Sequence, residues 1–424
     1  MRHTPPVFTT TAEEEPTPWF PEGKAIAFIC ISTLIVAFGP LFKIWPILIL
    51  YALWLPHIVH QNRLTLKPTT AGTVLWFLGG LSLVSTLWSN APATSLYNSI
   101  LFLSMLTCLS IISQTVRFET FIKALTISLF LTLLITLLSG NYMDIYATGE
   151  HALKGYFGNK NVVGYFASAG LIGAFSLLLS KDTWKLKAFY ASALILTLIS
   201  LLMSHSTTSI ISSTLMLAGC SAIIILGRFP PGLRILVFSL CILSGIGLIV
   251  FIVGSELPVF SKILEFFGKE PTLTGRTWLW SEGLQRAAER PLGGYGYRAF
   301  WLPENPDAQL LWHQSHFEKT QGFHFHNLYL ESQIELGIFG TITMAFLMLS
   351  TFVRSLYLAL TKKLSPEIIF SLGIAIMFTL RSITEVDIIG PFGLGPYLFF
   401  TTYLKIWKKQ PLKIAEPEKL RKNH

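Results

Sequence analysis

The chain has 424 residues, of which 52% are hydrophobic and 13% are charged. Such an apolar composition excludes an ordinary soluble domain and indicates a protein that crosses a membrane many times. The formal net charge of +9 would suit a nucleic-acid partner, but the basic residues follow a membrane topology, so we expect no nucleic acid.

Residues 1–24 are polar, proline-rich and acidic, which predicts a disordered tail and not a signal peptide. Residues 25–254 and 326–407 contain apolar stretches of the length that spans a bilayer, ~20 residues. The two shortest stretches could be re-entrant. The expected spans are Ala25–Phe42, Ile44–Val59, Ala71–Trp88, Tyr97–Ile112, Phe121–Leu138, Val162–Leu179, Phe189–Met203, Ser209–Leu226, Leu236–Gly254, Asn327–Phe352, Ile368–Thr379 and Pro391–Trp407.

Between the ninth and tenth spans, residues 255–325 form one long polar segment, and loops of that length are usually functional. Thr274 can cap a short amphipathic helix there, and Arg290-Pro291 ends it. The glycines that follow, Gly293, Gly294 and Gly296, suit a flexible turn better than a phosphate cradle. Residues 408–424 form a basic tail.

The lysines and arginines set the orientation. They gather in the loops on the side of the N-terminus, which predicts that both termini are cytoplasmic and that the loop 255–325 is periplasmic. These positions are Arg63, Lys67, Arg117, Lys123, Lys181, Lys185, Lys187, Arg228, Arg234, Arg354, Lys362, Lys363, Lys405, Lys408, Lys409 and Lys413. The predicted fold is an all-α polytopic membrane protein with about twelve transmembrane helices and one large periplasmic loop that contains short amphipathic helices.

The segment from His324 to Gly340 combines polar residues with an apolar helix. At 100° per residue, His326, Gly337 and Gly340 share one face, and the glycines predict a notch against another helix. Glu331 and Glu335 fall on the opposite face, where they must be protonated, wet or paired with a cation. Arg381 is the nearest cation in the predicted topology, and structural ion pairing is the alternative to a functional role for the two glutamates.

Several motifs, in this order, resemble the O-antigen ligase and polymerase superfamily, and most closely its exopolysaccharide-polymerase branch. They are GYFGNKNVVGYFAS (155–168), SHSTTS (204–209), GRTWLW (275–280) with RPLGGYGYRAFW (290–301), the His326-Asn327 pair followed after nine residues by G-x-x-G, and RSITE (381–385). The ligases carry an arginine where this chain has Thr207 and Thr208. Lys160 could supply the missing charge.

The resemblance implies transfer of a glycan from undecaprenyl pyrophosphate to an acceptor hydroxyl. It matches Arg276 to an arginine that engages the pyrophosphate and His326 to the proposed base. Such a leaving group needs cations, and a sugar hydroxyl needs a positioned base, so the residue types fit this chemistry. From the residues alone, Arg276 could equally form a surface ion pair with Glu270 or Glu282.

We therefore expect Arg276 and His326 to be catalytic. Substrate binding is expected from Lys160, Arg298, Arg381, His324, Asn327 and Glu331, and a structural role from Gly337 and Gly340. The four cysteines lie within spans without ligand spacing, so no metal site is predicted, and no cofactor is expected besides the lipid-linked donor. A single displacement at the anomeric carbon would invert it.

Three functions stay open at this point. A polymerase of O-antigen or exopolysaccharide repeat units in the bacterial inner membrane comes first, and a ligase that joins O-antigen to lipid A-core is second. A flippase or other transporter of lipid-linked glycan is the rival from another class, and a membrane scaffold is the remainder. The expected partners are the lipid-linked glycan, an acceptor glycan or lipid A-core, membrane lipids, a flippase and a chain-length regulator.

Overall fold

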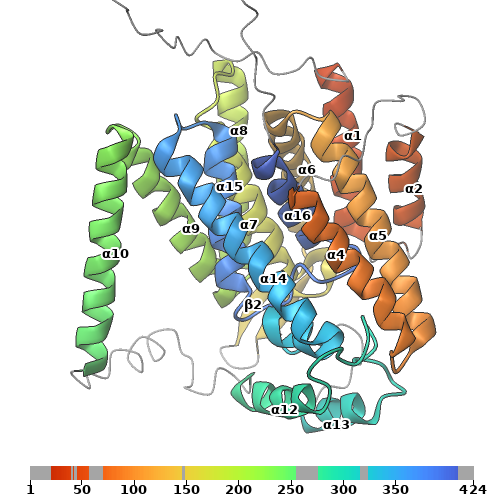
Figure 1. Ribbon diagram of the computed structural model, residues 1–424. Helices are drawn as coiled ribbons and strands as arrows, with labels where there is room; N and C mark the ends of the chain where they lie inside the picture. Colours follow the sequence, from red (N-terminus) through yellow and green to blue (C-terminus); the bar gives the residue numbers. More distant parts are fainter. Residues whose placement is uncertain are drawn as a thin grey trace, which may run out of the picture.

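The computed structural model describes residues 21–39, 42, 45–56, 70–145, 149–254, 276–315 and 323–408. This part of the chain is a helical bundle with one two-stranded hairpin (Figure 1). The α-helices are α1 (Glu22–Phe38), α2 (Trp45–Trp54), α4 (Thr70–Val84), α5 (Pro92–Thr115), α6 (Phe118–Leu138), α7 (Lys160–Leu177), α8 (Trp184–Met203), α9 (Thr207–Leu226), α10 (Pro231–Gly254), α12 (Arg276–Glu289), α13 (Pro306–Gln314), α14 (Leu328–Thr361), α15 (Pro366–Arg381) and α16 (Leu394–Trp407). The remaining elements are the 3-10 turns η2 (Ser85–Leu87) and η3 (Gly155–Phe157) and the antiparallel strands β1 (Tyr142–Ile145) and β2 (Glu150–Leu153).

Every expected span overlaps one of these helices, so the all-α class is confirmed for a membrane protein. Five helices of the described chain (α5, α6, α8, α9 and α14) are long and apolar enough to cross a membrane by themselves. The number of twelve crossings therefore stays a prediction. The first helix begins at Glu22, inside the expected tail, and residues 1–20 lie outside the described part.

Many hydroxyl side chains within the bundle bond to their own helices. Thr33 donates to the carbonyl of Ile29, Thr126 to that of Ile122 and Thr132 to that of Ser128. A lipid or protein interior offers no water to these groups, and a bond to the carbonyl four residues back satisfies them locally. This explains how helices rich in serine and threonine can be buried here.

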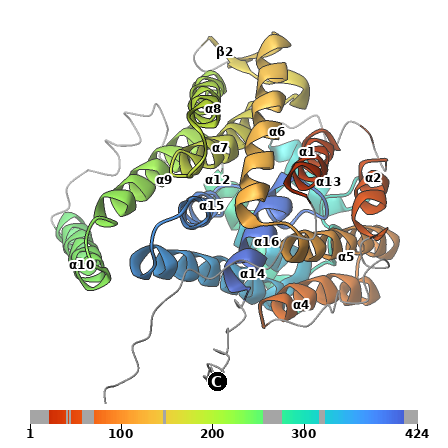
Figure 2. The same ribbon diagram turned by 90° about the horizontal axis from the view of Figure 1, so that it is seen from above.

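The helix α7 lies in the middle of the bundle and packs against α6, α8, α9 and α15. Two views show α10 standing at the edge of the bundle, and α12 and α13 lying across one end of it (Figures 1 and 2). At the other end, Lys123 pairs with Glu22 and Asp182, and Lys405 donates to the Val116 carbonyl. The start of α1 and the end of α16 therefore share the end opposite to α12.

The helix α14 is broken at Gly337, whose φ of 66° and ψ of −163° are not helical. The segment after α12 fills the break, because Tyr295 and Gly296 donate their N–H groups to the carbonyls of Ile334 and Glu335. A Cβ atom on Gly337 would lie 2.1 Å from the Leu292 carbonyl oxygen, so only glycine fits here. The predicted notch for a neighbouring helix is wrong at this position, since a loop approaches instead.

This inserted loop anchors the segment of α12 and α13 on the bundle. A second apolar core forms there between α12, α13, the inserted loop and the start of α14; it contains Leu279, Ala287, Tyr295, Phe300, Leu311, Phe325, Leu330 and Ile334. The tryptophan Trp280 donates its indole N–H to the Phe325 carbonyl at 2.8 Å. Residues 323–326 are thus held between the loop and the first turn of α14.

Candidate active site

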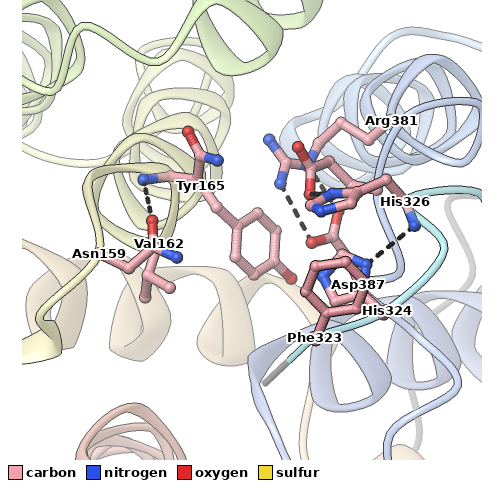
Figure 3. A pocket seen from close by; sticks show the side chains of 10 residues that line it. Asn159, Val162, Tyr165, Phe323, His324, His326, Arg381 and Asp387 are labelled. Atoms are coloured by element: carbon pink, nitrogen blue, oxygen red, sulfur yellow. Dashed lines mark hydrogen bonds and ion pairs between the residues drawn. The ribbon is translucent and has the colours of Figure 1, made fainter. Parts of the chain in front are cut away.

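A cavity of about 300 Å³ lies at the end of the bundle where α12 is docked. Its volume is at the lower end for small-molecule sites. Three segments line it: the start of α7, the short stretch before α14, and the end of α15 with the loop that follows (Figure 3). The lining residues are Asn159, Asn161, Val162, Tyr165, Phe323, His324, His326, Arg381, Glu385 and Asp387.

His326 lies just before α14 and not on it, because Asn327 is the N-cap. Its φ of 53° is in the left-handed region, which costs a non-glycine residue energy and clusters at functional sites. The backbone N–H of His326 donates to Nδ1 of His324 at 3.1 Å. The predicted helical face of His326 with Gly337 and Gly340 is therefore wrong, since neither the residue before the cap nor Gly337 is helical.

The ring of His326 faces a carboxylate. Its Nδ1 atom lies 3.7 Å from Oε2 of Glu385, an ion-pair distance longer than a hydrogen bond. Nδ1 is buried without a hydrogen-bond partner in the described chain. A carboxylate on the Nδ1 side favours a proton there and leaves Nε2 as the nitrogen that can accept one.

Glu385 is shared between Arg276 and His326. Its Oε1 atom accepts a hydrogen bond from Nη2 of Arg276 at 3.2 Å, while Oε2 faces His326. Burial alone would raise the pKa of Glu385, but His326, Arg381 and Arg276 together hold that pKa down to about 2. The carboxylate is therefore ionised at neutral pH and serves as the counter-ion of Arg276, while its second oxygen faces the His326 ring.

Arg276 is the first residue of α12. The expected alternative partner Glu282 is paired instead with Arg286 at 2.7 Å, and Glu270 lies outside the described residues. The guanidinium of Arg276 reaches across to the loop after α15, so the docking of α12 places a cation beside His326. Its planar fork suits a pyrophosphate.

The other predicted cations do not join Arg276 in one clamp. Arg381 forms a bidentate pair with Asp387, with nitrogen–oxygen distances of 2.6 and 3.1 Å, and its third nitrogen donates to Ser209. Lys160 donates to the carbonyl of His205. Neither Lys160 nor Arg298 lines the cavity.

Glu331 and Glu335 are buried, and the expected pairing with Arg381 is wrong. Glu335 lies 3.5 Å from Arg298, whose backbone is also left-handed with φ 58°. The reason is the break in α14, which lets residues 297–301 pass beside these glutamates. Glu331 accepts the N–H of Phe325 at 2.9 Å and the indole N–H of Trp301 at 3.1 Å. It thereby fixes the segment that carries both histidines.

Asn327 and His324 also have structural tasks. The Asn327 side chain caps α14 by accepting the N–H groups of Tyr329 and Leu330 at 3.0 Å. Burial, and next the electrostatic effect of His326, lower the pKa of His324 to about 3. His324 is therefore neutral near pH 7, and its Nδ1 lone pair supports the His326 backbone.

Three groups of this site could hold a metal ion, because ligand atoms of His324, His326 and Glu385 lie within 4.8 Å of one another. Two histidines and a carboxylate form a common donor set for divalent metals. Against this, Arg276 and Arg381 act on the same carboxylate, and their charge opposes a second cation. A metal-free site remains our prediction.

Sequence reasoning missed the half of the cavity formed by α7. Tyr165 stacks against Arg381, whose guanidinium carbon lies 4.7 Å from the ring centre, and Asn159 and Asn161 also line the cavity. Asp387 was missed as well. The motif at 155–168 contains Asn159, Asn161 and Tyr165, but uncharged side chains in an apolar run carry no signal of their own. Asp387 lies two residues after the motif at 381–385.

Comparison with known proteins agrees with the motifs. Residues 192–345 match the family described as O-antigen ligase. A curated relative, the exopolysaccharide production protein ExoQ of Rhizobium meliloti (strain 1021), is 29% identical over 389 residues, which cover 91% of this chain and 88% of the relative. The resemblance to the O-antigen ligase and polymerase superfamily is confirmed. The matched segment 192–345 includes Arg276 and His326, whereas Tyr165, Glu385 and Asp387 lie outside it.

Proposed function

We propose that this protein is a polysaccharide polymerase of the inner membrane. It moves a glycan from undecaprenyl pyrophosphate to a sugar hydroxyl on the periplasmic side, and it extends exopolysaccharide or O-antigen repeat units. The reaction inverts the anomeric carbon and needs no metal ion. The observation that carries the proposal is the arrangement of Arg276 and His326 on the two oxygens of Glu385. His326 and Glu385 line the cavity, and Arg276 reaches Glu385 from α12.

The chemistry is a single displacement. Nε2 of His326 accepts the proton of the acceptor hydroxyl while its oxygen bonds to the anomeric carbon. The bond from this carbon to the pyrophosphate oxygen breaks, and the negative charge that grows on the pyrophosphate faces Arg276. A positioned base contributes ~10²–10⁴-fold, and the arginine supplies electrostatic stabilisation that needs little reorganisation.

Glu385 couples these two steps. Without donor, Arg276 and His326 share one carboxylate. A pyrophosphate with several negative charges competes with Glu385 for the guanidinium, because it offers more acceptor oxygens. Once Arg276 turns to the donor, the carboxylate serves His326 alone. In this mechanism the base gains its full counter-ion only when the donor is bound.

The sidedness follows from the ends of the bundle. Lys123 and Lys405 lie at the end opposite to α12, and Lys181 belongs to the same end, because its neighbour Asp182 pairs with Lys123. The positive-inside rule supports a cytoplasmic position for that end and a periplasmic position for the cavity. An enzyme tag at Asp307 should report the periplasm and one at Lys185 the cytoplasm. A cytoplasmic signal at Asp307 would put the acceptor on the wrong side.

Ligation to lipid A-core is the second candidate, since the matched family is described as O-antigen ligase. The curated relative is named for exopolysaccharide production, which supports the polymerase. At the segment where the ligases carry an arginine, the positive charge comes from Arg381, which donates to Ser209 at 2.8 Å. Lys160, the expected substitute, bonds to His205 beside it.

A transporter is less well supported. It would need polar groups along a path through the bundle. The charged pairs of the described site gather instead at the end where α12 docks. A flippase and a chain-length regulator are more fitting as partners than as functions of this chain.

The test is transfer by the purified protein with lipid-linked repeat units, alone and then with lipid A-core. Chain growth without core supports the polymerase, and a single transfer onto core supports the ligase. Arg276→Ala should lose most activity with normal insertion, and Arg276→Lys should lose activity as well because lysine lacks the fork. Full activity of Arg276→Ala would show that the pyrophosphate binds to other residues.

A further inference from the structure

The cavity has two chemically different walls. One wall carries His326 and Glu385, with Arg276 behind them. The opposite wall carries Tyr165 and Asn161 of α7. Figure 3 shows Asp387 on the side that faces Tyr165, near His326 and Arg381. Asp387 is paired in bidentate fashion with Arg381, so this pair adds no net charge to the cavity.

The hydroxyl of Tyr165 is the observation that points to a ligand in this cavity. Tyr165 is 6% exposed, and its buried Oη atom has no hydrogen-bond partner in the described chain. Its ring extends from α7 towards the opposite segments (Figure 3). A buried hydroxyl without a partner is costly and is normally satisfied. Nδ1 of His326, on the other wall, is a second such atom.

The neighbours of Tyr165 are suited to sugar hydroxyls. The Oδ1 atom of Asn161 accepts from Ser206 at 3.1 Å, which leaves the NH₂ end of that amide as a donor. Each carboxylate oxygen of Asp387 can accept a further bond besides that from Arg381. A sugar hydroxyl both donates and accepts, so it can bond to Asp387 and to Tyr165 together. At neutral pH a pyrophosphate is negatively charged and mainly accepts hydrogen bonds. It would therefore meet the Asp387 carboxylate, which is also an acceptor, unfavourably.

We infer that Tyr165 and Asn161, across the cavity from His326, form the subsite for the acceptor sugar together with Asp387. This inference rests on the proposed function and assigns the substrate class of one wall. Uncharged hydroxyl groups of the acceptor bind here, and the reacting hydroxyl points to Nε2 of His326. The donor pyrophosphate lies on the other side, at Arg276.

The test separates the two walls with two soluble probes. The first probe is the repeat-unit oligosaccharide freed from its lipid by mild acid, and the second is inorganic pyrophosphate. Tyr165→Phe removes one oxygen and keeps the ring on Arg381. We expect the KM for the free oligosaccharide to rise roughly threefold to tenfold, the loss typical of one hydrogen bond. Pyrophosphate binding should stay unchanged.

Thermal stability supplies an independent readout. Removing an unpartnered buried hydroxyl should leave the melting temperature unchanged or raise it. The matched control is Tyr51→Phe in α2, because Oη of Tyr51 is also buried without a partner in the described chain but does not line the cavity. The control should change neither the oligosaccharide KM nor pyrophosphate binding.

The outcomes are distinguishable. An unchanged oligosaccharide KM in Tyr165→Phe, with normal polymer formation, overturns the subsite and leaves the proposed function standing. Weakened pyrophosphate binding in the same variant assigns this wall to the donor and also overturns it. A wild-type protein that binds the oligosaccharide through Tyr165 but forms no glycosidic bond supports the subsite and contradicts the proposed function.

Discussion

Replacement of Glu385 by glutamine should separate turnover from donor binding. The change keeps the size of the side chain and removes the charge that Arg276 and His326 share at 3.2 and 3.7 Å. The glutamine amide can also donate to Nδ1 of His326, which would move the ring proton to Nε2 and remove the acceptor for the substrate. Turnover should therefore fall.

The size of the loss follows from the distance. Opposite charges ~4 Å apart interact by ~4 kcal/mol at an effective dielectric constant of ~20. The carboxylate stabilises the imidazolium that forms in the transition state, and it acts from 3.7 Å without a hydrogen bond. Allowing for the incomplete contact, we expect a loss of roughly 10²–10³-fold in single-turnover rate. Pyrophosphate binding should become tighter, because Arg276 loses its competing counter-ion.

The assay combines single-turnover transfer from a radiolabelled lipid donor with titration of inorganic pyrophosphate. Glu282→Gln is the control, since Glu282 lies on the same helix as Arg276 and pairs with Arg286; it should leave both quantities near wild type. Equal losses in turnover and pyrophosphate binding for Glu385→Gln would indicate a merely structural carboxylate. A wild-type rate would refute the role of Glu385 altogether.

Four further predictions concern single groups or conditions. His326→Ala should remove most turnover while pyrophosphate still binds, and His324→Ala should be milder, as measured by transfer across pH; the reverse order would assign the base to His324. Gly337→Ala should lower the free energy of unfolding by at least ~1–3 kcal/mol, because a Cβ meets the inserted loop. The control Gly80→Ala, where a Cβ meets open space, should not lower it. Thermal melts of the two variants give the comparison. The pKa of His324 is about 3 in the folded protein against an ordinary 6.5. The unfolded chain therefore binds the proton first, and stability falls as the pH drops from about 6.5 towards 3. His324→Asn should reduce this fall, as measured by the melting temperature across pH. Dialysis against EDTA should leave the transfer rate intact, and a loss that a divalent metal restores would contradict the metal-free site.

The sequence by itself determined the class of protein and the helical ranges. Apolar runs near membrane length carry their own signal, because the backbone must satisfy its hydrogen bonds within each segment in lipid. The ordered motifs likewise predicted the superfamily. They also singled out Arg276 and His326, which the structure places on either side of one carboxylate.

Only the tertiary structure decided how these residues meet. The helical wheel assumed one continuous helix from His326 to Gly340, and a single glycine break with an inserted loop removed that face. The same loop brought Arg298 to Glu335 and left Arg381 for Asp387. Periodicity cannot foresee this, since a loop pairs with helix carbonyls through its own backbone N–H groups, and backbone groups are the same in every residue except proline.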